Sequence, residues 1–230
     1  MKFGIVTFPG SNCDEDAYVA VADALGEEAV RLWHKDHDLQ GCDVIILPGG
    51  FSYGDYLRSG AIARFSPIMR EVIAHAERGA PVLGICNGFQ ILCEAHLLPG
   101  ALLRNASLQF VSEMVTLRVE NAATRFTNRY HEGQVLRIPV AHGDGRFTIA
   151  DEGLRALEDA GQVVFRYANA AGAIVPEANP NASLDNIAGI VNAHGNVLGM
   201  MPHPERAVDA RLGSKDGLAL FESMLATVSA

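Results

Sequence analysis

The stretch Pro81-Val82-Leu83-Gly84-Ile85-Cys86-Asn87-Gly88-Phe89-Gln90-Ile91-Leu92 decides the fold. Its first five residues are an apolar run typical of a buried strand, and the residues from Gly88 onward carry apolar side chains at helical spacing. Cys86 stands between the two, with Gly84 two residues before it and Gly88 two residues after it. This Gly-x-Cys-x-Gly pattern predicts a nucleophile elbow, a sharp strand-to-helix turn that needs small flanking residues. The sulfur then lies at a helix N-terminus, which favours a nucleophilic thiolate.

The first half of the chain alternates apolar runs with helical patterns. Strands are expected at 2–8, 28–33, 43–47 and 81–85, and helices at 14–25, 67–78 and 88–95, with Gly79 closing the second helix. Strand–helix alternation with short connections predicts an α/β fold: a flavodoxin-like, mostly parallel, doubly wound sheet.

The second half is richer in strands. We expect strands at 108–120, 135–140, 163–167, 187–192 and 197–201, and a closing helix at 215–228. No linker or internal repeat divides the chain, so the sequence predicts a single domain over 1–230 with an antiparallel insertion.

Composition excludes several classes of protein. The 230 residues carry a net charge of −9 without a basic cluster, which argues against nucleic acid or an anionic membrane as the main partner. No apolar run reaches the roughly 18 residues of a membrane span, and the chain begins on a strand rather than a signal peptide. The four cysteines lack Cys-x-x-Cys spacing and predict reduced thiols in a cytoplasmic protein.

A cysteine nucleophile needs a base and a group that orients the base. His203 follows an apolar strand in Pro202-His203-Pro204-Glu205, and residues i and i+2 of an extended segment point the same way. We therefore expect Glu205 to bind one imidazole nitrogen while the other faces Cys86. Considered alone, His203 could equally be a loop histidine between two prolines.

An acyl-transfer site also needs donors for the developing oxyanion. The Asn87 amide follows the nucleophile, and a second amide could come from the turn of Gly49, Gly50 and Phe51 after a neighbouring strand. Taken in isolation, that glycine pair is better explained as a plain tight turn.

Other candidates are weaker. The polar segment 34–38 holds two histidines but lacks further ligands at metal spacing, so no metal site is expected. Cys13 is a rival nucleophile between a strand and a helix, but the acidic residues that follow it disfavour its thiolate, and we interpret it as a helix-entry residue. No phosphate-loop or dinucleotide motif is present.

With these motifs in hand, the chain resembles the class I (triad) glutamine amidotransferase family. Cys86, His203 and Glu205 match that family's nucleophile, base and orienting acid, and Gln90 matches the glutamine that helps to hold the substrate. The segments 8–12, 49–60, 141–147 and 201–206 further resemble the glutaminase subunits (PurQ) of phosphoribosylformylglycinamidine synthase, a group within that family.

The resemblance implies a ligase complex of purine biosynthesis with glutaminase activity. Its glutaminase hydrolyses L-glutamine through a Cys86 thioester, with the amides of Gly50 and Asn87 on the oxyanion, and needs no cofactor of its own. Ammonia passes to a large synthetase subunit (PurL), which uses ATP and Mg²⁺ to make formylglycinamidine ribonucleotide (FGAM) from formylglycinamide ribonucleotide (FGAR). A small subunit (PurS) completes the family's complex. The resemblance assigns no role to Cys13 or His142.

Two alternatives stay open at this point. A stand-alone cysteine hydrolase of γ-glutamyl substrates could use the same elbow, because a fold does not fix a substrate. A non-enzymatic stress protein with Cys86 as a redox sensor could share the topology, but it would not need His203 and Glu205.

Overall fold

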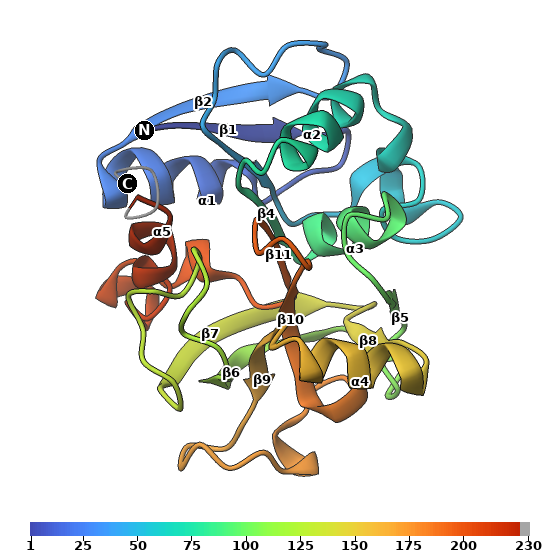
Figure 1. Cartoon of the computed structure of the whole chain (residues 1–230), viewed down its shortest axis with the longest axis vertical. Helices are drawn as coiled ribbons and strands as arrows, with labels where there is room; N and C mark the ends of the chain where they lie inside the picture. The colour runs from blue at the N-terminus through green and yellow to red at the C-terminus, as the bar shows by residue number, and fades with distance from the viewer. Residues whose placement is uncertain (226–230) are drawn as a thin grey trace.

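The computed structural model describes residues 1–225 and is built around one sheet (Figure 1). Its strand order is β2-β1-β3-β4-β11-β10-β9-β6-β7. The strands are β1 (Lys2–Thr7), β2 (Glu28–Trp33), β3 (Val44–Leu47), β4 (Val82–Ile85), β6 (Val111–Val119), β7 (Val135–His142), β9 (Val163–Tyr167), β10 (Ile187–Val191) and β11 (Val197–Met200). The sheet positions the site at the carboxyl ends of its central parallel strands.

The first five strands in that order pair in parallel and form the flavodoxin-like half. Its helices are α1 (Asp14–Val19), α2 (Pro67–Glu77) and α3 (Asn87–Glu94), and α5 (Leu218–Leu225) comes last in the chain. α1 and α5 lie to the left of β4 and β11 in Figure 1, and α2 and α3 lie to their right. Both faces are thus covered, which is why all residues of β3 and β4 are apolar or glycine and buried.

The strand-rich second half continues the same sheet. From β11 onward the pairings of β10, β9, β6 and β7 are antiparallel, as the sequence predicts. A separate two-stranded sheet of β5 (Ala101–Leu103) and β8 (Arg146–Thr148) lies beside it. Phe147 of β8 stacks on Phe89 of α3 at 5.9 Å between ring centroids, so the two halves share one core.

Several boundaries differ from the sequence prediction. The helix at 14–25 starts as α1 but continues as a π-helical segment from Ala20 to Leu25, and the wider turn leaves Ala24 exposed. β6 starts at Val111 because Leu108 closes a turn with φ +59°. Helix α4 (Asp151–Asp159) was not predicted. α5 begins at Leu218, and residues 226–228 of the predicted helix lie outside the described residues.

No helix within residues 1–225 has the length and apolar character to cross a membrane.

The elbow depends on close backbone contact between β4, α3 and β3. A Cβ added at Gly88 would lie 1.9 Å from the Leu47 carbonyl oxygen, and one at Gly84 would lie 2.7 Å from the Gly88 carbonyl. Because the obstructing atoms are backbone atoms, no side-chain rotation relieves either clash. The two glycines of the Gly-x-Cys-x-Gly pattern are therefore required by packing.

We expect Gly88→Ala to lower the free energy of unfolding by about 3 kcal/mol or more, because the new methyl group overpacks β3 against α3. The measurement is urea unfolding followed by circular dichroism. Gly195→Ala is the matched control: its Cβ would meet nothing within 4 Å, so only its left-handed φ of +69° costs stability, about 1 kcal/mol. Equal losses in the two variants would contradict the packing argument.

Candidate active site

Cys86 lies at the corner between β4 and α3 in a strained conformation. Its φ of 51° and ψ of −104° are sparsely populated for a residue with a side chain. Its amide donates to the Met200 carbonyl of β11 at 2.8 Å, and its thiol faces the Ala141 carbonyl of β7, with 3.6 Å between Sγ and oxygen. The predicted elbow is present, and its sulfur lies between the parallel and antiparallel halves.

His203 and Glu205 follow β11 and are almost fully buried, at 1% and 2% exposure. His203 Nδ1 donates to Glu205 Oε1 at 2.6 Å, the hydrogen bond expected from their spacing. The His203 amide donates to the Pro139 carbonyl of β7 at 2.8 Å. The loop between the two prolines therefore holds the imidazole by its ring and by its backbone.

The imidazole and Cys86 meet at Gly49, the residue after Pro48 at the end of β3. A Cβ added at Gly49 would lie 2.7 Å from His203 Cε1 and 3.4 Å from Cys86 Cβ, so only glycine leaves room for both side chains. His203 Nε2 has no hydrogen-bond partner within residues 1–225. The nitrogen opposite Glu205 is thus available to the thiol or to a bound substrate.

Electrostatics favour a charged imidazole. Burial lowers the pKa of His203, but the Glu205 carboxylate and the nearby Cys86 oppose it and raise that pKa well above its usual value. A protonated His203 beside the thiol can give a proton to a leaving group, and the neutral form can accept one.

Both residues predicted to supply oxyanion donors are near Cys86: Asn87 follows it in the chain, and Gly50 lines the same cavity. Gly50 has a φ of +143°, and a Cβ there would lie 2.8 Å from the Asn12 nitrogen, so the turn requires glycine. Asn87 is the first residue of α3, and its side-chain oxygen accepts from the Ser52 amide at 3.1 Å. This bond fixes the Gly50 turn against the elbow.

A cavity of about 310 Å³ contains Cys86. The predicted residues Gly50, Phe51 and Gln90 line it, together with Asp55, Ser59, Arg104, Leu108, Phe110, Ala141, His142, Gly143 and Asp144. The Gln90 amide bridges two protein groups: it accepts from Asn87 Nδ2 at 2.8 Å and donates to the Asp144 carbonyl at 2.7 Å. Gln90 thereby joins α3 to the loop after β7.

Cys13 lies closer to this site than the sequence indicates. It is the N-cap residue of α1, as expected of a helix-entry residue, but its sulfur, a His203 nitrogen and a Glu205 oxygen all lie within 4.8 Å of one another. Arg206 Nη2 donates to the Cys13 sulfur at 3.2 Å, which brings a cation to a thiol that we expected among carboxylates. Within residues 1–225, Cys13, His203 and Glu205 form the one group of side chains spaced closely enough to bind a metal ion. However, one carboxylate oxygen of Glu205 already accepts a hydrogen bond from the His203 imidazole.

Sequence reasoning also missed a buried network behind the cavity. His142 Nδ1 donates to Asn105 Oδ1 at 3.2 Å, and Asn181 Nδ2 donates to His142 Nε2 at 3.3 Å. Burial and the charge of His203 lower the pKa of His142 to about 4, so this imidazole is neutral at physiological pH. His142 therefore orders the wall of the cavity rather than competing with His203 as a base.

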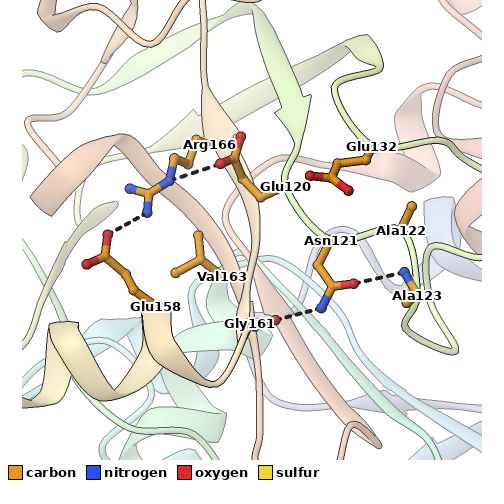
Figure 2. Close-up of a pocket in the computed structure, with 9 residues that line it drawn as sticks. All are labelled: Glu120, Asn121, Ala122, Ala123, Glu132, Glu158, Gly161, Val163 and Arg166. Atoms are coloured by element: carbon orange, nitrogen blue, oxygen red, sulfur yellow. Dashed lines mark hydrogen bonds and ion pairs between the residues drawn. The ribbon is translucent and has the colours of Figure 1, made fainter.

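A second pocket lies among the antiparallel strands (Figure 2). Arg166 donates from Nη2 to Glu158 at 2.9 Å, and its Nε lies 3.5 Å from Glu120, so both carboxylates are compensated. Asn121 is held by the Gly161 carbonyl and the Ala123 amide. The residues that line this pocket form an ion-pair network and include no nucleophile. The Cys86 cavity is therefore the better candidate for the active site.

Comparison with known proteins agrees with this geometry. Residues 1–216 match the family of CobB/CobQ-like glutamine amidotransferase domains. The phosphoribosylformylglycinamidine synthase subunit PurQ of Chlorobaculum tepidum is 64% identical over 223 residues, covering 97% of this chain and 95% of that protein.

Solved structures agree as well. A chain of the PurLQS structure from Thermotoga maritima has a TM-score of 0.88 at 45% identity, with 99% of each chain covered. A glutamine amidotransferase from T. maritima, at 16% identity and a TM-score of 0.62, covers 100% of this chain and 99% of that one and shows the shared fold.

We expect Glu205→Gln to lower the pKa of His203, because the carboxylate that raises it is removed while the burial that lowers it remains. The measurement is an NMR pH titration of the His203 ring protons. Glu132→Gln, an exposed acid of the second pocket, is the control and should leave the His203 titration where it is. An unchanged His203 pKa in Glu205→Gln would show that the carboxylate does not set it.

Proposed function

The chain belongs to the CobB/CobQ-like glutamine amidotransferase family, and on that premise we propose that it is the glutaminase subunit of a phosphoribosylformylglycinamidine synthase. It hydrolyses L-glutamine to glutamate and supplies the ammonia for making FGAM from FGAR. The observation that carries the proposal is the Cys86 elbow, which faces a buried imidazole bonded to Glu205.

The first half of the reaction forms a thioester. The Cys86 thiolate attacks the side-chain amide carbon of glutamine, and the amides of Gly50 and Asn87 stabilise the oxyanion. Protonated His203 gives its proton to the leaving nitrogen, the carbon–nitrogen bond breaks, and ammonia departs. The carboxylate of Glu205 supports this step because it holds the imidazole by Nδ1 and stabilises its charge.

The second half releases glutamate. His203, now neutral, takes a proton from water, and the resulting hydroxide attacks the thioester carbon. The carbon–sulfur bond breaks and Cys86 returns as thiolate beside the protonated imidazole. One water is consumed, and each cycle gives one glutamate and one ammonia.

Ammonia is used on another chain. We place the use of ATP and Mg²⁺ on the partner synthetase and the complex in the cytoplasm; the lack of a phosphate-loop motif in this sequence supports that division of labour, in which this chain works without a cofactor. The relatives are named as subunits, and the structural relative is part of a PurLQS structure. By analogy, the partners of this chain are a large synthetase and a small third subunit.

An apolar rim around the cavity supports docking to such a partner. We define it as Phe51, Tyr56, Leu57, Leu108 and Phe110, whose exposed fractions range from 43% to 89%. Phe51, Leu108 and Phe110 line the cavity itself while remaining exposed, and the ring centroids of Phe51 and Phe110 lie 6.3 Å apart. Large apolar groups gathered at an active-site mouth are typical of an interface, which would also keep released ammonia from water.

A stand-alone γ-glutamyl hydrolase is the less favoured alternative. Such an enzyme has no need of an apolar rim at its mouth, and the full-length relatives are named as subunits of a synthase. A redox sensor without catalysis would not need the buried pair of His203 and Glu205.

We expect Cys86→Ala to abolish glutamine-dependent FGAM formation by the reconstituted complex and to leave ammonia-dependent formation intact. The nucleophile is lost, but the synthetase still accepts free ammonia. Cys42→Ala, a buried thiol of the β1–β3 core, is the control and should keep both activities. Glutamine-dependent FGAM formation by Cys86→Ala would exclude the thioester route.

We expect Leu57→Asp to weaken binding of the large synthetase by at least about tenfold, because a charge enters the proposed apolar interface at its most exposed side chain. Analytical ultracentrifugation or surface plasmon resonance with the purified subunits measures it. Val135→Asp, on an exposed apolar residue at the opposite end of β7 from the site, is the charge-matched control. Unchanged affinity for Leu57→Asp would place the interface elsewhere.

A further inference from the structure

Cys13 lies beside the catalytic pair, and the proposed mechanism does not use it. Its side chain is buried, at 3% exposure, and its sulfur lies within 4.8 Å of both a His203 nitrogen and a Glu205 oxygen. A Cβ added at Gly49 would lie 3.1 Å from this sulfur and 2.7 Å from His203 Cε1. The sulfur of Cys13 therefore lies beside both the imidazole and the turn at Gly49.

Arg206 holds this sulfur in place. Its Nη2 donates to Cys13 Sγ at 3.2 Å, and its Nε donates to Asp16 Oδ2 at 2.8 Å, so two hydrogen bonds tie the loop after β11 to the start of α1. The backbone amide of Arg206 donates to the His203 carbonyl at 3.2 Å. The guanidinium that holds the sulfur thus belongs to the same short loop as the base.

The hydrogen bonds of Cys13 favour a neutral thiol over a metal ligand. The thiol donates to Asn12 Oδ1 at 3.2 Å while its sulfur accepts from Arg206, so both of its hydrogen-bonding roles are filled. A divalent cation at this sulfur would be repelled by the guanidinium beside it. A neutral sulfur held in this way supports its neighbours by contact.

The imidazole of His203 needs such support. Its ring is held by one hydrogen bond, from Nδ1 to Glu205, while His203 Nε2 and Glu205 Oε2 are buried without a hydrogen-bond partner within residues 1–225. A single hydrogen bond lets a ring turn about the bond, so the atoms packed around the ring must fix its orientation.

We propose that Cys13 is a positioning residue of the glutaminase reaction: its sulfur, held by Arg206, keeps the His203 imidazole in reach of Cys86. The assignment rests on the proposed function, because it takes His203 as the base that serves Cys86. Neither Cys13 nor Arg206 lines the Cys86 cavity, so both act through His203 rather than on glutamine. Loss of the contact slows the chemical step more than it weakens glutamine binding.

The kinetic test removes the sulfur in the reconstituted complex. We expect Cys13→Ala to lower kcat for glutamine-dependent FGAM formation at least about tenfold and to change the KM for glutamine less than about threefold, because a displaced base costs rate rather than binding. Cys13→Ser keeps a donor for Asn12 and an acceptor for Arg206 and should recover part of the loss. Ammonia-dependent formation should be unchanged in both variants. Cys42→Ala, which removes another buried thiol, is the matched control.

The second readout is the pKa of His203, measured by NMR titration of its ring protons in the full chain. Among the described residues, the titratable or charged groups around this imidazole come from its own loop, the elbow, α1 and β7: Glu205, Arg206, Cys86, Cys13 and His142. Because contact with Cys13 contributes to raising the His203 pKa, Cys13→Ala should lower that pKa, and by less than Glu205→Gln does. His203 then loses its proton at lower pH, so the alkaline limb of the rate profile should move to lower pH.

A double-mutant cycle tests whether Arg206 acts through the sulfur. Arg206→Gln alone should lower kcat severalfold, but adding it to Cys13→Ala should cost at most about twofold more, because residues that act through one contact are not additive. Arg211→Gln, which removes an exposed guanidinium paired with Asp209 on the same segment, is the matched control.

Each contrary outcome has a distinct meaning. If Cys13→Ala keeps full glutamine-dependent activity, or leaves the His203 titration unchanged, the assignment is wrong. If it loses glutamine-dependent and ammonia-dependent formation to the same degree, the sulfur only supports folding or assembly, and the assignment is also wrong. Fully additive losses in the cycle would show that Arg206 does not act through Cys13. Failure of the unmodified complex to form a γ-glutamyl thioester on Cys86, found by peptide mass, would instead overturn the proposed function.

Discussion

The site depends on one local constraint, the strained backbone conformation of Cys86. The glycines two residues before and two residues after it pack directly against neighbouring backbone atoms. Cys86 keeps its φ of 51° because its amide is bonded to β11 and α3 starts at once behind it. Gly88 lies against the Leu47 carbonyl and Gly84 lies against Gly88, so β3, β4 and α3 pack more closely than any larger residue permits. The strain of about 1–3 kcal/mol that such a conformation costs is offset by burial of the surrounding strands.

The remaining parts of the site come from elements far apart in the sequence, and sheet pairing brings them to this corner. β11 lies parallel to β4, so the loop after β11 brings His203 to the same edge as Cys86. The antiparallel strand β7 supplies the Ala141 carbonyl that faces the thiol and the Pro139 carbonyl that holds His203. The nucleophile thus belongs to the parallel half, while its base is held by both halves.

The sequence predicts this corner well because local constraints determine it. The Gly-x-Cys-x-Gly pattern is a packing requirement, and the hydrogen bond between His203 and Glu205 follows from residue spacing on an extended segment. The approach of Cys13 to His203 could not be predicted, since it depends on how α1 meets the loop after β11. Helix α4 was missed although Leu154 and Leu157 have helical spacing, with acidic residues at its start and Gly161 beyond its end.

The loop of residues 51–60 connects the interior of the cavity to the outer surface. It is fastened to the elbow by the Ser52 amide on Asn87 and to α3 by Arg58, which donates to both carboxylate oxygens of Glu94. Between these attachments, Tyr53, Asp55 and Leu57 all have positive φ, so the segment is held in a costly conformation. Asp55 points to the cavity, while Tyr56 and Leu57 are largely exposed on the rim. Any protein that packs on these exposed side chains therefore acts on the backbone that positions Asp55 in the cavity, because Asp55 directly precedes Tyr56 in the chain.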